Sequence, residues 1–212
     1  MFFARPADEE ELQRREALGT IRASRLVRVF AESSKPITAS CIYDIHRTIF
    51  EKAWPEIAGV FRTEEATITD SPHLPPHFSQ VSGLMIELDK VLQQEIHSLV
   101  ALPVMERFDG PLEERKVQMI GRIVHVAAWV HHRIVYIHPF VDGNGRAARL
   151  MANLILERHR LIGISIKIER ENKNRYRSAL QQIDQRGDYE PLENIIIEGL
   201  LDRYNGIRQK VV

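Results

Sequence analysis

The segment HPFVDGNGRAAR, residues 138–149, brings one histidine, one aspartate, one asparagine, two glycines and two arginines into a single short stretch. An apolar periodicity typical of a helix runs into it over residues 114–137, and a second helical pattern begins at Arg146. The segment is therefore predicted to be a loop that opens onto a helix N-terminus, where free N–H groups and the helix dipole favour an anion. Gly143 and Gly145 permit positive φ angles, so that backbone N–H groups can surround phosphate oxygens. This stretch predicts a polyphosphate site between two helices.

Length and composition favour one soluble domain. The chain has 212 residues, of which 44% are hydrophobic, and this is enough for one sizeable core. Lysine plus arginine and aspartate plus glutamate both number 29, so we expect no general affinity for nucleic acid. The single cysteine, Cys41, excludes an internal disulfide and fits a reducing compartment. No apolar run approaches the roughly 20 residues of a membrane span, and the first residues do not read as a secretory signal; we expect a cytoplasmic protein without membrane contact.

The remainder of the chain has mostly helical patterns. Asp8 is expected to cap a first helix, and Pro55 is expected to end the second. Between residues 60 and 70, β-branched residues followed by prolines predict a small hairpin and an exposed loop. The other predicted helices cover residues 40–54, 78–100, 111–137, 146–159, 169–185 and 189–204.

The segment 138–149 resembles the signature of the Fic/Doc family, HPFx(D/E)GNGRxxR, at every specified position. Similar flanking features are His131-His132-Arg133, residues 57–62 and residues 174–180. The resemblance implies an all-α Fic fold, a bundle of about seven to eight helices with a small β-hairpin flap beside the active-site loop. It assigns residues 40–201 to a Fic domain, residues 1–39 to an N-terminal helical extension and residues 202–212 to a C-terminal tail, all within a single compact unit.

The resemblance also implies an activity, the transfer of AMP from ATP to a Ser, Thr or Tyr hydroxyl of a target protein with Mg²⁺. His138, whose ordinary pKa is about 6.5, is expected to be the general base. Asp142 offers a hard carboxylate oxygen to Mg²⁺, and Phe140 is expected to be a buried apolar plug. The expected nucleotide-binding residues are Gly143, Asn144, Gly145, Arg146 and Arg149.

The flap, residues 63–70, is expected to hold an extended segment of the target by adding a strand to it. The flap residues expected to contact the target are Thr63, Thr67 and Ile68. Because main-chain pairing specifies little sequence, the identity of the target protein does not follow from these residues.

Other functions stay open: another nucleotidyl transfer, phosphate transfer and nucleotide sensing. In the Doc branch the nucleotide binds in reverse and the γ-phosphate is transferred, but that branch carries a lysine near the position of Gly145, so the glycine pair favours AMP transfer. A nucleotide sensor without catalysis would not need both His138 and Asp142. ATP labelled at the α- or the γ-phosphate separates the two enzymatic alternatives.

Three further histidines, His125, His131 and His132, lie on the helix that leads into the motif. They are expected to pack or to support other groups, and the absence of zinc-type spacing in the sequence argues against a zinc site. Tyr176 could face the adenine or belong to the core, and the sequence leaves both open.

Many Fic proteins restrain themselves with a helix that bears (S/T)xxxE(G/N), whose glutamate pairs with the second arginine of the motif. Glu171, Glu193 and Glu198 precede Gly or Asn here, but none has Ser or Thr four residues earlier. Inhibition within the chain is therefore not expected. Arg149 is expected to be either free or restrained by a separate small partner that supplies the glutamate, as in the toxin–antitoxin branch of the family.

Overall fold

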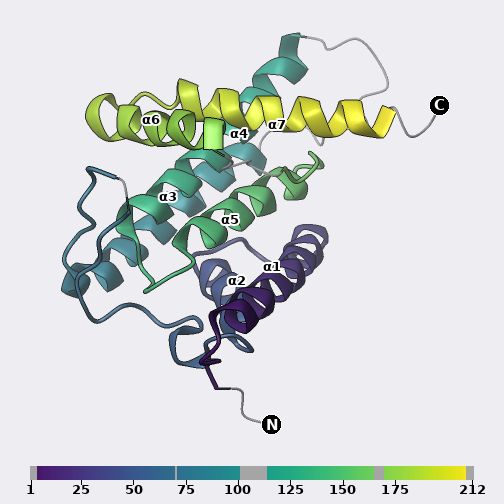
Figure 1. Cartoon of the computed structure of the whole chain (residues 1–212). Helices are drawn as coiled ribbons and strands as arrows, with labels where there is room; N and C mark the ends of the chain where they lie inside the picture. The colour runs from purple at the N-terminus through teal and green to yellow at the C-terminus, as the bar shows by residue number, and fades with distance from the viewer. Residues whose placement is uncertain (1–3, 70, 101–113, 165–169, 209–212) are drawn as a thin grey trace.

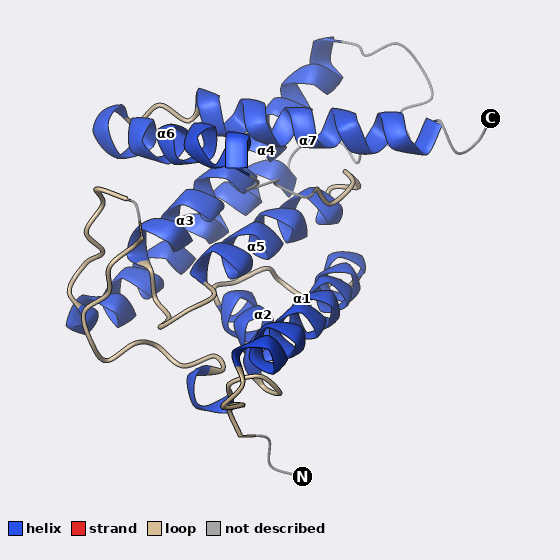
Figure 2. Ribbon diagram, viewed as in Figure 1, coloured by secondary structure: helices blue, strands red, loops and turns tan. Residues whose placement is uncertain are grey.

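The structure, a computed structural model, describes residues 4–69, 71–100, 114–164 and 170–208. Within these ranges it contains seven α-helices, two short 3-10 helices and no strand (Figures 1 and 2), which confirms the all-α prediction. The α-helices are α1 (Glu9–Glu32), α2 (Ser40–Phe50), α3 (Val81–Val100), α4 (Glu114–Ile137), α5 (Asn144–Arg158), α6 (Arg170–Arg186) and α7 (Glu190–Arg208), and the 3-10 helices are η1 (Pro55–Ile57) and η2 (Phe78–Gln80). The helix start expected at residue 111 lies outside the described residues, as do residues 209–212 of the tail expected over residues 202–212. Residues 202–208 of that tail belong to α7 instead.

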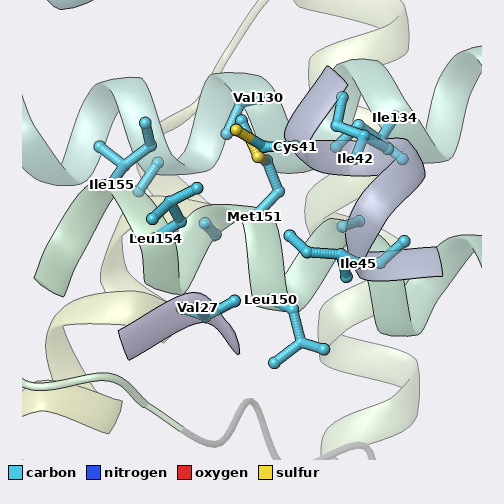
Figure 3. Close-up of a cluster of buried hydrophobic side chains, with 14 of the residues drawn as sticks. Val27, Cys41, Ile42, Ile45, Val130, Ile134, Leu150, Met151, Leu154 and Ile155 are labelled. Carbon is cyan, nitrogen blue, oxygen red and sulfur yellow. The ribbon is translucent and has the colours of Figure 1, made fainter. Parts of the chain in front are cut away.

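Helix α5 lies at the centre of the molecule. Its buried side chains cover most of the circumference of the helix, as expected for a helix that packs against several others. It packs against α4, α1 and α2. Figure 3 shows its residues Leu150, Met151, Leu154 and Ile155 beside Val27 of α1, Ile42 and Ile45 of α2, and Val130 and Ile134 of α4. Because α5 is held on several sides, the loop at its N-terminus starts from a fixed position.

Helix α1 is packed closely against the rest of the bundle. Its N-terminus is capped as predicted, since the Asp8 side chain accepts a hydrogen bond from the Glu11 N–H at 3.0 Å. Gly19 faces α2 so closely that a Cβ there would lie 1.9 Å from the Ile49 carbonyl oxygen. The two backbones therefore approach each other at a position where only glycine fits.

The predicted β-hairpin is not confirmed, because residues 63–69 form no strand and follow an irregular path. At one end the Arg62 N–H donates to the Pro139 carbonyl oxygen at 2.9 Å, and at the other the Arg177 guanidinium donates to the Thr69 carbonyl oxygen at 3.3 Å. These backbone groups bond to the motif and to α6 rather than to a second strand. Among the described helices, none combines the length and the apolar character that a membrane span requires.

Candidate active site between α4 and α5

His138 lies immediately after α4 and continues its hydrogen bonding, since its N–H donates to the Ile134 carbonyl oxygen at 2.9 Å. Its φ of 50° is left-handed, which is uncommon for a residue other than glycine. The ring atom Nδ1 lies 3.3 Å from the Val135 carbonyl oxygen, which can only accept, so Nδ1 carries the hydrogen and Nε2 has the free lone pair. Burial lowers the pKa of His138, and the nearby positive charge of Arg62 lowers it further. The imidazole is therefore neutral at pH 7, with Nε2 able to accept a proton.

Asn144 closes the loop on itself. Its Oδ1 accepts from the Phe140 N–H at 2.9 Å, and its Nδ2 donates to the Phe140 carbonyl oxygen at 2.8 Å. The side chain is only 2% exposed, so its amide shapes the loop from inside. Phe140 is fully buried, as predicted, and anchors the same turn in the core.

The loop is also held from α2 by His46, a residue that was not predicted from the sequence to take part in the site. The His46 ring is stacked on Phe140 with centroids 3.7 Å apart. Its Nδ1 accepts from the Gly59 N–H at 3.0 Å, so Nε2 carries the hydrogen and donates to the Asp142 carbonyl oxygen at 2.8 Å. Burial lowers the pKa of His46 to about 4, which keeps this arrangement neutral.

Gly143 allows the turn from the loop into α5. It caps the helix with φ at 76°, and a Cβ at this position would lie 2.3 Å from the Phe50 ring. Both the backbone conformation and the available space therefore require glycine. The predicted place of this residue at the helix N-terminus is confirmed.

Asp142, Arg146 and Glu16 form a chain of charged groups at the start of α5. Arg146 Nη2 lies 3.2 Å from Asp142 Oδ2, and Arg146 Nη1 lies 2.5 Å from Glu16 Oε2 on α1. The side chain of Asp142 is 53% exposed, whereas that of Glu16 is 13% exposed. In this structure one guanidinium is therefore shared by two carboxylates, one open to solvent and one largely enclosed. Glu16 was not predicted as a site residue from the sequence.

Arg149 lies one turn after Arg146 on the same helix. A Cβ on Gly145 would approach its Nη1 to 3.3 Å, so the guanidinium folds back along the first turn of α5. Burial lowers the pKa of Arg149, and the positive charge of Arg146 acts in the same direction. The two arginines are thus close enough to affect each other, at a helix end that favours anions.

The other histidines of α4 are paired with the C-terminal helices. His125 contacts Glu193 at 2.6 Å and His132 contacts Asp184 at 2.9 Å. His131 Nε2 lies 2.7 Å from the Tyr176 hydroxyl, and Tyr176 is buried. These contacts place the histidines between helices, and within the described residues no group of three or more histidine, cysteine or acidic side chains is arranged to hold a metal ion.

The flap residues lie next to the motif, because the backbone bond from Arg62 to Pro139 fixes the start of the flap. Thr63 and Thr67 are exposed, and Ile68 is half-buried. Glu198, the nearest approximation to an inhibitory glutamate in the sequence, is paired with Arg175 at 2.5 Å.

Comparison with known proteins agrees with this geometry. Residues 36–156 match the model of the Fic/DOC family. The protein adenylyltransferase Fic of Nematostella vectensis is 29% identical over 197 residues, which cover 91% of this chain and 40% of the relative. The chain therefore spans about two-fifths of the length of that relative.

Solved structures show the same fold. Fic-1 from C. elegans has a TM-score of 0.71 at 23% identity, and the match covers 99% of this chain and 56% of the Fic-1 chain. The BepC protein from Bartonella tribocorum was solved with bound AMPPNP. It has a TM-score of 0.64 at 18% identity, and the match covers 92% of this chain and 88% of the BepC chain. Since the family match includes α2, the loop and most of α5 and extends over more than half of the residues, the chain belongs to the Fic/DOC family.

Proposed function

We propose that this chain is a protein adenylyltransferase, which transfers AMP from ATP to a Ser, Thr or Tyr hydroxyl of a target protein. The observation that carries the proposal is the neutral imidazole of His138, with Nε2 as acceptor, at the edge of a glycine loop that leads into the helix bearing Arg146 and Arg149. The membership of the family and the names of the relatives support the same activity.

In the proposed reaction the acceptor hydroxyl oxygen attacks the α-phosphorus of ATP. His138 Nε2 takes the proton of the hydroxyl, a P–O bond to AMP forms, and the bond between the α-phosphorus and its bridging oxygen breaks to release pyrophosphate. Arg146 and Arg149, with the backbone N–H groups of Gly143 and Gly145, would stabilise the negative charge on the phosphate oxygens. Asn144 would contribute by keeping the loop in shape.

Mg²⁺ fits the donor that the loop presents. The carboxylate of Asp142 is a hard oxygen ligand and is more than half exposed; its Oδ2 lies beside Arg146, and its Oδ1 accepts a hydrogen bond from the Gly143 N–H. Such a site suits an ion that keeps several waters and also binds phosphate oxygens. When bound, Mg²⁺ would supply positive charge to those oxygens, and Asp142 would hold it.

The flap is proposed to form a strand pair with the target. Residues 63–69 form no ladder within the described part of this chain, so an extended segment of the target could pair with them. Thr63, Thr67 and Ile68 would contact that segment. A hydroxyl on it would then be presented to His138, because the flap begins beside the motif.

A separate small protein is the proposed regulator, as in the toxin–antitoxin branch of the family. It would supply a carboxylate to Arg149 and so compete with the phosphates of ATP. Self-labelling of the purified chain should fall when the product of a small neighbouring reading frame is added.

The experiment that tests the activity is incubation of the chain with cell lysate and ATP labelled at the α- or the γ-phosphate, with and without Mg²⁺. We expect label in protein from α-labelled ATP only, dependent on Mg²⁺. The variant His138→Ala should lose about 10²- to 10⁴-fold of the rate, the usual contribution of a general base, and should still bind ATP. Label from the γ-phosphate would indicate phosphate transfer, and an equally active His138→Ala would remove the base from the proposal.

A further inference from the structure

Arg62, just before the flap, makes an unusual set of contacts with the end of α4. Its backbone N–H donates to the Pro139 carbonyl oxygen at 2.9 Å, its Nε donates to the His138 carbonyl oxygen at 2.7 Å, and its Nη2 makes a longer contact of 3.5 Å with the Ile137 carbonyl oxygen. One residue therefore binds three consecutive carbonyl groups around His138. The side chain is 3% exposed, so these bonds are made away from solvent.

The same guanidinium also holds the flap. Nη1 donates to the Glu64 carbonyl oxygen at 2.9 Å, and Nη2 donates to the Pro76 carbonyl oxygen. Glu64 lies within the flap and Pro76 lies after it. The segment that is proposed to hold the target and the residue that is proposed to be the base are thus linked through one rigid, planar group.

The backbone of His138 has particular need of such support. Its left-handed φ of 50° is unfavourable for a side chain with a Cβ, and the following Pro139 restricts it further. The carbonyl groups at the end of a helix lack partners within the helix and need them from elsewhere. Arg62 supplies these partners, because a guanidinium presents five donors and stays charged when buried.

We propose that Arg62 is the positioning residue of the transfer reaction. It fixes the His138 backbone relative to the flap, so that an acceptor hydroxyl held by the flap lies at the imidazole. This inference rests on the proposed function. It assigns Arg62 no contact with ATP, since its hydrogen bonds are all to carbonyl groups of the chain.

The test compares Arg62→Lys with Arg158→Lys in the full chain. Arg158 also donates to two backbone carbonyl groups, those of Phe30 at 2.7 Å and Lys35 at 2.9 Å, but at the other end of α5. Lysine keeps the charge in both variants and loses the planar fork. The measurements are label incorporation from α-labelled ATP with lysate, as kcat and as KM for ATP, and the equilibrium affinity for ATP with Mg²⁺.

We expect Arg62→Lys to lower kcat by at least about tenfold, because a displaced general base loses its alignment. The affinity for ATP should change by less than about threefold, because the phosphate loop is held separately by Asn144 and His46. Arg158→Lys should leave both quantities near those of the parent chain. If Arg62→Lys is too unstable to measure, Arg62→Gln, which keeps planar N–H donors, takes its place.

An Arg62→Lys that labels as fast as the parent overturns the inference and leaves the proposed function intact. Loss of ATP binding in parallel with kcat, in both Arg62 variants, also overturns it, because Arg62 would then support the whole site rather than the base. A parent chain that incorporates no label overturns the proposed function and this inference together.

Discussion

Each residue of the loop has its own role, and the role of His138 as a base depends on its pKa. Burial is the main cause of its lowered pKa, and the nearby Arg62 and His73 lower it further, while the Val135 carbonyl and Asp142 act in the opposite direction. A histidine with a lowered pKa stays neutral to a lower pH than 6.5, the ordinary value. The proton acceptor that the reaction needs is therefore present throughout the neutral range.

The pH dependence of the transfer rate follows from this shift. With the enzyme saturated with ATP and Mg²⁺, the rate should be constant around pH 7 and should fall only as the pH drops through a midpoint below 6.5. Initial rates of label incorporation between about pH 5 and 8 measure it. A midpoint at or above the ordinary value would mean that His138 is not the titrating base.

Gly143 offers a second prediction for a single residue. Gly143→Ala adds a Cβ 2.3 Å from the Phe50 ring and keeps a φ of 76°, whereas Gly187→Ala keeps a φ of 67° with no atom within 4 Å. Both substitutions carry backbone strain of about 1 to 2 kcal/mol, and only the first adds a steric clash. We expect Gly143→Ala to be the less stable variant in urea unfolding and to lose ATP binding. Equal losses of stability in the two variants, with ATP binding retained, would show that the loop tolerates a side chain.

Helices in this chain follow closely from the sequence, because their signals are local. The motif predicted a loop onto a helix N-terminus, and the structure has that loop, with α5 starting at Asn144 instead of Arg146. Asp8 caps α1 as expected. Such features depend on a few neighbouring residues, on apolar periodicity and on capping groups.

Contacts between helices could not be predicted in the same way. Glu16 and Arg146 lie 130 positions apart, and nothing in the charged first helix distinguishes Glu16 from its neighbours. His46 sits on an apolar helix face, which is compatible with many roles. The hairpin was wrongly favoured by local β-propensity, since the backbone groups at both ends of residues 63–69 bond to distant elements.

The contact between α1 and α5 leads to a prediction at the scale of these elements. Glu16 holds Arg146 at 2.5 Å, so a triphosphate must compete with it for the guanidinium. Glu16→Gln removes the competing charge, and Kd for ATP should fall by about two- to tenfold, a range typical of one partly buried ion pair. Titration of ATP with Mg²⁺ into both proteins measures the change.

A matched control for this substitution lies on the same helix. Glu11 pairs with Arg14 and Arg15, both also in α1 and both outside the loop. Glu11→Gln should leave ATP affinity unchanged. Weaker binding of ATP by Glu16→Gln would contradict the prediction, because Glu16 would then hold Arg146 in place for the phosphates instead of competing with them.

Residues 1–39, which contain α1, were expected to form an N-terminal extension within a single compact unit. Helix α1 packs on both α2 and α5, and its residues Leu12, Ala23 and Val27 are buried. It also delivers Glu16 to the candidate active site. These contacts favour the single compact unit predicted from the sequence, in which the stability of α1 and that of the site are linked.

Substitutions of two helix glycines test whether α1 and the rest of the chain form one folding unit. A Cβ at Gly19 of α1 would lie 1.9 Å from the Ile49 carbonyl oxygen of α2, whereas a Cβ at Gly121 of α4 would meet nothing within 4 Å. Alanine in a helix is favoured over glycine by about 0.5 to 1 kcal/mol, so Gly121→Ala should raise the free energy of unfolding by about that amount. Gly19→Ala should lower it by about 1 to 3 kcal/mol, as overpacking does, because α1 must move away from α2.

If α1 is part of one cooperative unit, Gly19→Ala should shift a single unfolding transition for the whole chain to lower urea, and the displacement of Glu16 should alter ATP affinity as well. The same two measurements on Gly121→Ala provide the reference for a helix glycine without a close neighbour. A separate early transition for α1, with ATP affinity and the main transition unchanged, would mean that residues 1–39 fold as an appendage to a Fic domain that is complete without them.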